Sequence, residues 1–332
     1  MMKKALTARE QVNEIAAFRE KTVKAAENYL IGFESIIDEI LTAFLAGGHV
    51  LLIGVPGLGK TLLVKTLSHL WGLSFSRIQF TPDLLPSDIT GTEILQENID
   101  KNKRLIREFE FQKGPVFANL VLADEINRTP PKTQSALLQA MEEKEVTVGR
   151  RTLKIEEPFM VMATQNPIEM EGTYPLPEAQ LDRFFISLNL QYPEHEKEKE
   201  IALISYNNQK TLDKLKTVDN AKKILKYREL IDSVMIPDSV LEKMITSVRN
   251  TRPSSGHPYA ARFGEYGAGP RAAQYLVRAA RARALILGET LVTEEIFEMV
   301  YYNVLRHRII LNYAALSEKI SVDEYLADCL IS

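Results

Sequence analysis

The sequence predicts an α/β fold in which helices cover a parallel sheet, followed by a second, all-helical domain. Three observations indicate this arrangement. An apolar run at residues 49–53 leads through a glycine-rich loop into a segment with helical spacing. Two further apolar runs, at 119–123 and 159–164, end in polar residues, as buried strands of a parallel sheet do. Beyond residue 192 the helical pattern takes over.

The composition is that of a globular protein, with 332 residues of which 45% are hydrophobic and 26% are charged. This length favours two domains, which we place at residues 1–192 and 193–332. The net charge of −3 predicts no general attraction to nucleic acid or anionic membranes. The single cysteine, Cys329, excludes an internal disulfide and suits a reducing compartment. With no predicted membrane span or signal peptide, we expect a soluble cytoplasmic protein.

Two helices are predicted before the glycine-rich loop. A capping box at Thr7 and Glu10 should begin the first helix, which runs to about residue 28. The second should span about 34–46 and end at the glycine pair 47–48.

The loop itself, residues 54–61, matches the phosphate-binding P-loop motif G-x-x-x-x-G-K-[ST]. Its glycines allow several backbone N–H groups to point at one phosphate chain, and the following helix N-terminus adds positive partial charge. Lys60 should reach the β- and γ-phosphates of ATP, and the Thr61 hydroxyl should bind Mg²⁺. A glycine-rich turn before a structural helix is the alternative. The predicted nucleotide contacts are Gly54, Pro56, Gly57, Leu58, Gly59, Lys60, Thr61 and Leu62.

After the P-loop helix we predict a strand at 75–80 and a loop at 81–88 that contains two prolines. An inserted hairpin should follow at about 91–114. Its arms are predicted at 92–95 and 105–111, with a polar turn at 98–103.

Two acids, Asp124 and Glu125, follow the apolar run at 119–123. Ligands bind at the carboxyl ends of parallel strands. Asp124 should hold Mg²⁺ through water as a Walker B aspartate, and Glu125 should polarise the attacking water. A polar turn after a strand would look the same in isolation, but the position about 60 residues after a P-loop favours the functional interpretation.

A helix is predicted at 132–143, a second hairpin at about 146–155 and a buried strand at 159–164. Asn166 follows this strand. It could touch the γ-phosphate or its water, or it could be an ordinary turn residue before a proline. The spacing leaves both possibilities open.

The second domain is predicted to contain helices and no further clear strands. Pro270 suits the first turn of a helix, and a capping box begins at Ser321. Residues 251–269, rich in glycine and proline, should form a long loop. We expect Arg278, Arg281 and Arg283 on the outer face of their helix. The predicted helices span about 195–209, 213–231, 238–250, 270–287, 293–307 and 322–330.

From about residue 31 to 311 the chain resembles the AAA+ ATPases, and among them the MoxR family. Long stretches carry the resemblance, so it is far more specific than the P-loop alone. They include residues 47–52, 79–92, 123–128, 131–138, 163–167, 172–184, 269–272 and 305–308. The resemblance implies an αβα nucleotide-binding domain with a helical lid, which hydrolyses ATP with Mg²⁺.

Three residue roles follow from the resemblance. Asn166 matches the sensor 1 position, and Arg183 matches the arginine finger donated to a neighbouring subunit's γ-phosphate. Arg271 matches sensor 2, which is expected to reach the γ-phosphate of its own subunit. A site completed by a neighbour implies a homo-oligomeric ring, expected to be a hexamer. The hairpins at 91–114 and 146–155 resemble the helix-2 insert and the pre-sensor 1 hairpin.

The chain departs from the family pattern in three places. Phe33 replaces a polar residue expected near the adenine, which leaves the base contacts there open. Ala268-Gly269 precedes Pro270 where Ala-Ser is usual, and Arg150-Arg151 makes a hairpin tip more basic than expected. The five histidines show no metal-ligand spacing and are expected to be structural or at the surface.

We therefore expect a ring-forming ATPase with a chaperone-like role in remodelling or maturing proteins. By resemblance its partners would include von Willebrand factor A domain proteins. A nucleic-acid-dependent motor, a chelatase-like motor subunit and a nucleotide-gated scaffold without turnover are the alternatives. The negative net charge argues against the nucleic-acid motor. The basic residues Arg150, Arg151 and Lys154 argue for it. The presence of Glu125 and Arg183 disfavours the scaffold.

Overall fold

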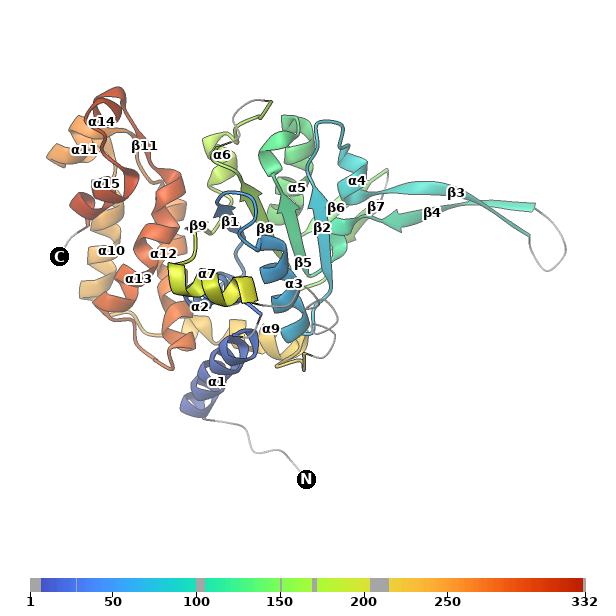
Figure 1. The fold of residues 1–332 in the computed structure, drawn as a ribbon, viewed down its shortest axis with the longest axis horizontal. Helices are drawn as coiled ribbons and strands as arrows, with labels where there is room; N and C mark the ends of the chain where they lie inside the picture. Colours follow the sequence, from blue (N-terminus) through green and yellow to red (C-terminus); the bar gives the residue numbers. More distant parts are fainter. Residues whose placement is uncertain are drawn as a thin grey trace.

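A five-stranded parallel sheet forms the centre of the first domain (Figure 1). The computed structural model describes residues 7–27, 29–99, 105–149, 151–168, 172–203 and 215–330. The strand order is β2-β5-β8-β1-β9, and every neighbouring pair is parallel. This confirms the predicted α/β class. The strands are β1 (Val50–Ile53), β2 (Phe75–Gln79), β5 (Leu120–Asp124), β8 (Met160–Gln165) and β9 (Ile186–Asn189).

Edge strand β9 was not among the predicted elements. It is four residues long and places Ser187 and Asn189 among its apolar residues, so its pattern is too short to stand out. Only its pairing with β1, in which Val50 lies opposite Ile186, makes it a strand.

Successive residues of the central strands enter two different cores. Leu51, Val121 and Val161 pack into one core, which includes Leu137 of α5 (Pro131–Glu143). Their neighbours in the strands, such as Leu52 and Leu122, pack into the other core with α2 (Glu34–Leu45) and α3 (Lys60–Leu70). Because side chains alternate across a strand, apolar residues at consecutive positions require a cover on both faces. The second core continues into the C-terminal helices.

Helix α1 (Ala8–Ala26) begins with the predicted capping box, in which Thr7 and Glu10 satisfy each other's backbone N–H groups. Its Arg19 donates two hydrogen bonds to Asp38 of α2, at 2.8 and 2.6 Å. The helix also packs against α12 (Pro270–Ile286) of the second domain. The N-terminal helix therefore contacts both predicted domains.

The inserted hairpin consists of β3 (Gly91–Ile99) and β4 (Leu105–Lys113), which project away from the body as a long arm (Figure 1). The strands are longer than predicted, and Asn98 belongs to β3 rather than to a turn. Residues 100–103 of the predicted turn lie outside the described residues. The predicted loop at 81–88 contains the start of a short helix, α4 (Pro86–Thr90), because a proline suits the first helical turn.

The second hairpin, β6 (Glu145–Val148) and β7 (Arg151–Lys154), agrees with its prediction, and Arg150 at its tip lies outside the described residues. Short helix α6 (Glu178–Leu181) precedes β9. Short 3₁₀ turns occupy Pro115–Phe117, Ile126–Arg128, Ile231–Ser233, Pro253–Ser255 and Arg306–Arg308.

The C-terminal part is helical, with one small sheet that was not predicted. Strands β10 (Gly264–Tyr266) and β11 (Ile310–Leu311) form an antiparallel pair between segments far apart in the chain. Two of the helices are α7 (His195–Leu203) and α9 (Ala221–Glu229). The other helices that the structure describes here are α10 (Asp238–Asn250), α11 (Pro258–Phe263), α12, α13 (Glu294–Leu305), α14 (Tyr313–Ser317) and α15 (Val322–Cys329).

Two predictions for this part need correction. In the described part of the helix expected at 213–231, residues 215–220 form no helix and α9 begins at Ala221, where Asn220 caps it. The Val218 N–H donates to the Leu70 carbonyl. Residues 213 and 214 lie outside the described residues. The loop expected at 251–269 contains α11 and β10. Pro270 at the first turn of α12 and the capping box at Ser321 are confirmed. The boundary at residue 192 falls between β9 and α7 and stays a prediction.

Ion pairs join the helical part to the sheet domain. Arg283 of α12 is 4% exposed and pairs with Glu39 of α2, so the expectation that it lies on an outer face is wrong. Arg308 donates to Asp182 at 2.8 Å from a buried position. In the described part of the chain, no helix has the length and apolar character needed to cross a membrane.

Candidate functional site

The P-loop curls between β1 and α3, as predicted. Gly57 and Gly59 have φ values of +87° and +74°, a backbone conformation that residues with a Cβ rarely adopt. Gly59 caps α3 without any side-chain hydrogen bond, so the first N–H groups of this helix can serve a phosphate. The backbone conformation thus supplies the anion cradle that the motif implies.

A cavity of about 490 Å³ opens over this loop. Its size suits a nucleotide. The cavity brings the predicted acids and Asn166 to the P-loop. These three parts of the site lie at the ends of three different strands, β5, β8 and β1. The lining residues are Pro56, Gly57, Leu58, Gly59, Lys60, Thr61, Leu62, Arg77, Gln79, Asp124, Glu125 and Asn166.

Lys60 lies over the loop that precedes it, and its Nζ donates to the Gly54 carbonyl. Burial lowers the pKa of Lys60, while the negative charges of Asp124 and Glu125 oppose that shift. An ammonium group has three donors, so Lys60 can hold the loop and still bind a phosphate.

Asp124 and Glu125 are positioned by Thr164 on the adjacent strand β8. The Thr164 hydroxyl donates to Asp124 Oδ1 at 2.8 Å and accepts the backbone N–H of Glu125 at 2.8 Å. Glu125 has φ of +58°, a left-handed conformation that is uncommon for a residue with a side chain. Such strain gathers at functional sites, where it directs a side chain that a regular strand would place elsewhere.

Sequence reasoning missed the second group of polar residues in this cavity. Arg77 of β2 contacts Asp124 Oδ2 through Nη2 at 2.6 Å and Nε at 3.2 Å. Gln79 donates to Glu125 Oε2 at 3.1 Å, and Arg128 Nε lies 3.1 Å from the same oxygen. Gln79 pairs directly with Asp124 in the sheet register. The available signal was the polar end of a strand that should neighbour the acid-bearing one.

Asn166 is 7% exposed, and its Oδ1 accepts the N–H of Ile168 at 3.1 Å. It therefore forms the local turn that the sequence left open, and it also lines the cavity. The two interpretations are compatible.

The donor set fits a magnesium–nucleotide complex. The Thr61 hydroxyl and the Asp124 carboxylate are hard oxygen ligands in the same cavity as the phosphate cradle. When bound there, Mg²⁺ would neutralise charge on the phosphate oxygens. The ring of Phe33 lies close by, since a Cβ built on Gly59 would lie 3.9 Å from Phe33 Cζ.

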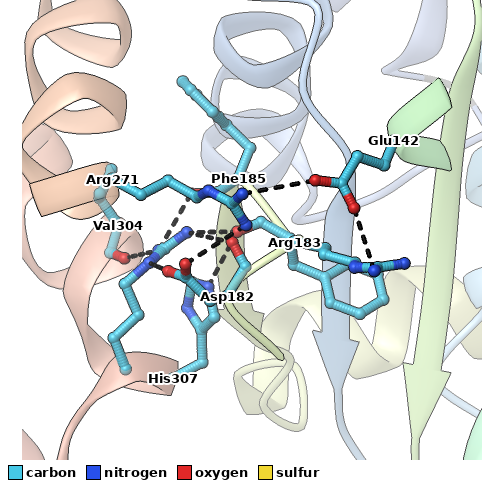
Figure 2. A network of polar contacts seen from close by, with 9 residues as sticks. Glu142, Asp182, Arg183, Phe185, Arg271, Val304 and His307 are labelled. Atoms are coloured by element: carbon cyan, nitrogen blue, oxygen red, sulfur yellow. Dashed lines mark hydrogen bonds and ion pairs between the residues drawn. The ribbon is translucent and has the colours of Figure 1, made fainter. Parts of the chain in front are cut away.

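The two predicted arginines lie in a second cavity, of about 670 Å³. Figure 2 shows Arg183 and Arg271 approaching the carboxylate of Glu142 from two sides. Arg183 Nη2 lies 3.0 Å from Glu142 Oε2, and Arg271 Nη2 lies 3.4 Å from Glu142 Oε1. Arg271 Nη1 also lies 3.4 Å from Asp182 Oδ2.

This arginine cavity lies at the N-terminal ends of the parallel strands, whereas the P-loop lies at their C-terminal ends. The P-loop follows β1, whereas Gly48 precedes β1 and Arg183 precedes the parallel strand β9. A four-residue strand separates these two ends by about 13 Å. In this single chain Arg271 therefore lies away from its own P-loop, and its sensor 2 role stays a prediction. The start of α12 packs beside the end of α5, where Glu142 and Asp182 hold Arg271.

Comparison with known proteins agrees with this architecture. A family model described as "ATPase family associated with various cellular activities (AAA)" matches residues 49–186, and an AAA lid domain model matches residues 259–328. A crystal structure of a candidate ATPase from Cytophaga hutchinsonii has a TM-score of 0.86 and 40% identity. It covers 98% of this chain and 97% of that chain.

Curated relatives match over most of their length. Chaperone MoxR1 of Mycobacterium tuberculosis is 41% identical over 91% of this chain and 78% of its own. The uncharacterized protein YeaC of Bacillus subtilis is 40% identical over 93% and 92%. Protein MoxR of Paracoccus denitrificans is 30% identical over 90% of each chain. The chain therefore belongs to the MoxR family of AAA+ ATPases.

Proposed function

We propose that this protein is a Mg²⁺-dependent ATPase that works as a ring and uses hydrolysis to remodel or mature partner proteins. One observation carries the proposal. The P-loop cavity gathers Lys60, Thr61, Asp124 and Glu125, while the arginines needed to complete phosphoryl transfer lie in a separate cavity.

In the proposed reaction Lys60 and the loop N–H groups hold the phosphates, and Thr61 and Asp124 hold Mg²⁺. Glu125 polarises the attacking water, and Asn166 orients it or the γ-phosphate. The reaction transfers the γ-phosphoryl group to water, which gives ADP and phosphate.

The separation of the two cavities supports a shared site. Arg183 cannot reach its own P-loop across the sheet, so it would serve the nucleotide of the next subunit. Arg271 shares Glu142 with Arg183, and we extend the same role to it. A chain that offers a nucleotide at one end of the strands and arginines at the other can assemble by head-to-tail contacts, which form a ring where the rotation between subunits closes. The hexamer expected by resemblance remains a proposal.

The test is the Glu125→Gln variant. It should bind ATP with Mg²⁺ and lose hydrolysis, since an amide cannot accept a proton from water. Glu143→Gln, an exposed substitution at the end of α5, is the matched control and should hydrolyse ATP normally. Normal turnover by the Glu125 variant would refute the proposal.

The remodelling role is supported by the name of a chaperone among the relatives. Binding to von Willebrand factor A domain proteins and a cytoplasmic location stay predictions. Glu125→Gln trapped with ATP should retain a partner protein during purification from native lysate. Sedimentation velocity with ATP would show the ring.

A nucleic-acid-dependent motor remains the second candidate, because Arg151 and Lys154 are exposed on β7. The net charge of −3 opposes it. ATPase stimulation by DNA that falls as salt rises would favour this alternative.

A further inference from the structure

Arg77 holds the carboxylate that the proposed function assigns to Mg²⁺. Both oxygens of Asp124 have partners in the structure. Oδ1 accepts from the Thr164 hydroxyl at 2.8 Å, and Oδ2 accepts from Arg77 Nη2 and Nε at 2.6 and 3.2 Å. The Arg77 side chain is 47% exposed, whereas that of Asp124 is 16% exposed. The cation is therefore the more exposed partner, and water can solvate it when it leaves the carboxylate.

A second contact fixes the guanidinium in this position. Arg77 Nη2 also donates to Gln79 Oε1 at 2.8 Å, and the Gln79 amide nitrogen donates to Glu125 at 3.1 Å. Arg77 is thus bound directly to the predicted metal-binding acid, Asp124, and through a single side chain to the predicted catalytic acid, Glu125. Both contacts come from strand β2, which neighbours the acid-bearing strand in the sheet.

We propose that Arg77 is the counter-ion of Asp124 in the nucleotide-free protein and that Mg²⁺, entering with the nucleotide, displaces it. Two positive charges that share one carboxylate repel each other, so Arg77 and Mg²⁺ oppose each other's binding. Arg77 is a positioning residue, since it acts through Asp124. This inference rests on the proposed Mg²⁺-dependent binding of ATP.

The test is the Mg²⁺ concentration that half-saturates binding of a fluorescent ADP analogue. Arg77→Met removes the competing charge and keeps an unbranched side chain of similar bulk near the backbone, so the half-saturating concentration should fall by about 2- to 5-fold, the range of a partly exposed ion pair. Arg77→Lys keeps the charge and should remain within about 2-fold of the parent protein. Arg262→Met is the matched control, because this exposed arginine pairs with Glu318 in the helical part and does not line the P-loop cavity. It should leave the half-saturating concentration unchanged.

A second measurement detects a merely structural role. Without nucleotide and metal, Arg77→Met should lower the midpoint of thermal unfolding, because Asp124 loses its counter-ion. Saturating Mg²⁺ and ADP should abolish that difference. The inference is overturned if Arg77→Met leaves the half-saturating Mg²⁺ concentration unchanged, raises it, or lowers it no more than Arg262→Met does. It is also overturned if the thermal difference persists in the saturated protein. A parent protein that binds the analogue without any need for Mg²⁺ would instead refute the proposed function.

Discussion

Arg183 and Arg271 bind opposite oxygens of one carboxylate, that of Glu142, although they come from different domains. Arg183 precedes the edge strand β9, and Arg271 lies in the first turn of α12. Glu142, with Asp182 beside Arg271, offsets their positive charge in the single chain. When a neighbour's nucleotide approaches, its phosphates would offer the two guanidinium groups a stronger acceptor than one exposed carboxylate.

Loss of either arginine should therefore impair hydrolysis and spare nucleotide binding. We expect Arg183→Ala to slow steady-state hydrolysis by roughly 10³-fold, the effect of an arginine finger supplied in trans. Arg271→Ala should slow it by roughly 10²-fold, the effect of one electrostatic donor. Affinity for ATP, measured by titration calorimetry, should stay close to that of the parent protein.

Hydrolysis by mixed rings should distinguish whether Arg271 serves the nucleotide of its own subunit or that of the neighbour. On their own, subunits with Arg271→Ala should hydrolyse ATP slowly and subunits with Glu125→Gln should not hydrolyse it. If Arg271 serves the neighbour, mixing them creates interfaces that combine an intact Glu125 with an intact arginine, and part of the hydrolysis returns. If Arg271 served its own nucleotide, no such interface would exist and the mixture would stay inactive. The pair Arg183→Ala and Glu125→Gln is the positive control.

Gly57→Ala should weaken nucleotide binding more than it destabilises the fold. Gly57 has φ of +87°, and a Cβ built there meets nothing within 4 Å, so the direct cost is about 1–2 kcal/mol of backbone strain. The strained residue lies in the phosphate cradle, so affinity for ATP should fall by about 10-fold or more. Gly256→Ala is matched in φ, at +88°, and in open space, but it lies in the lid. Equal nucleotide affinities in the two variants would contradict the assignment of the cradle.

Arg283→Met should destabilise the protein by about 3 kcal/mol, because it removes the charged partner of the largely buried Glu39 and leaves it only the hydrogen bond with Asn303. Burial already raises the pKa of Glu39, which shows how poorly this site tolerates an uncompensated charge. The double variant with Glu39→Leu should recover most of the loss. Denaturant unfolding measures these differences.

Arg281→Met provides the comparison on the same helix, since its partner Asp232 has a side chain that is 92% exposed. It should cost about 0.5 kcal/mol or less. A similar cost at both arginines would show that the Arg283 pair does not join α12 to α2.

Stability should fall as the pH drops below about 6.5, before most carboxylates titrate. Burial lowers the pKa of His49 to about 4 and that of His307 well below its ordinary value. In this range the unfolded chain binds protons that the folded chain does not, so acid favours unfolding. His49 alone should contribute up to about 3 kcal/mol by pH 4. The His49→Gln variant should show a shallower loss between pH 6.5 and 5 than the parent, and equal slopes would disprove the role of His49.

Much of the nucleotide site was predictable because its parts are local. The strand, loop and helix around Lys60 are contiguous, and Asp124 and Glu125 end an apolar run that could only be a buried strand. The structure confirms that these segments meet at one edge of a parallel sheet. Sheet topology requires this once the strands are parallel.

Arg77 and Gln79 could not be assigned from the sequence. Their contacts depend on β2 lying beside β5 rather than beside β1, the strand that precedes it in the chain. Edge strand β9 and the pair β10–β11 were missed for a related reason, because short strands acquire their conformation from a distant partner.

The sequence by itself determined the class of the fold, the family and the phosphate-binding loop, since periodicity, glycine positions and motif spacing are properties of neighbouring residues. The tertiary structure alone decided where the second domain places its arginines. Arg271 lies with Arg183 and not with Lys60, because the packing of α12 against α1 and α2 and the buried Arg283–Glu39 pair fix the direction of that helix. Such contacts join residues more than two hundred positions apart, and no local pattern encodes them.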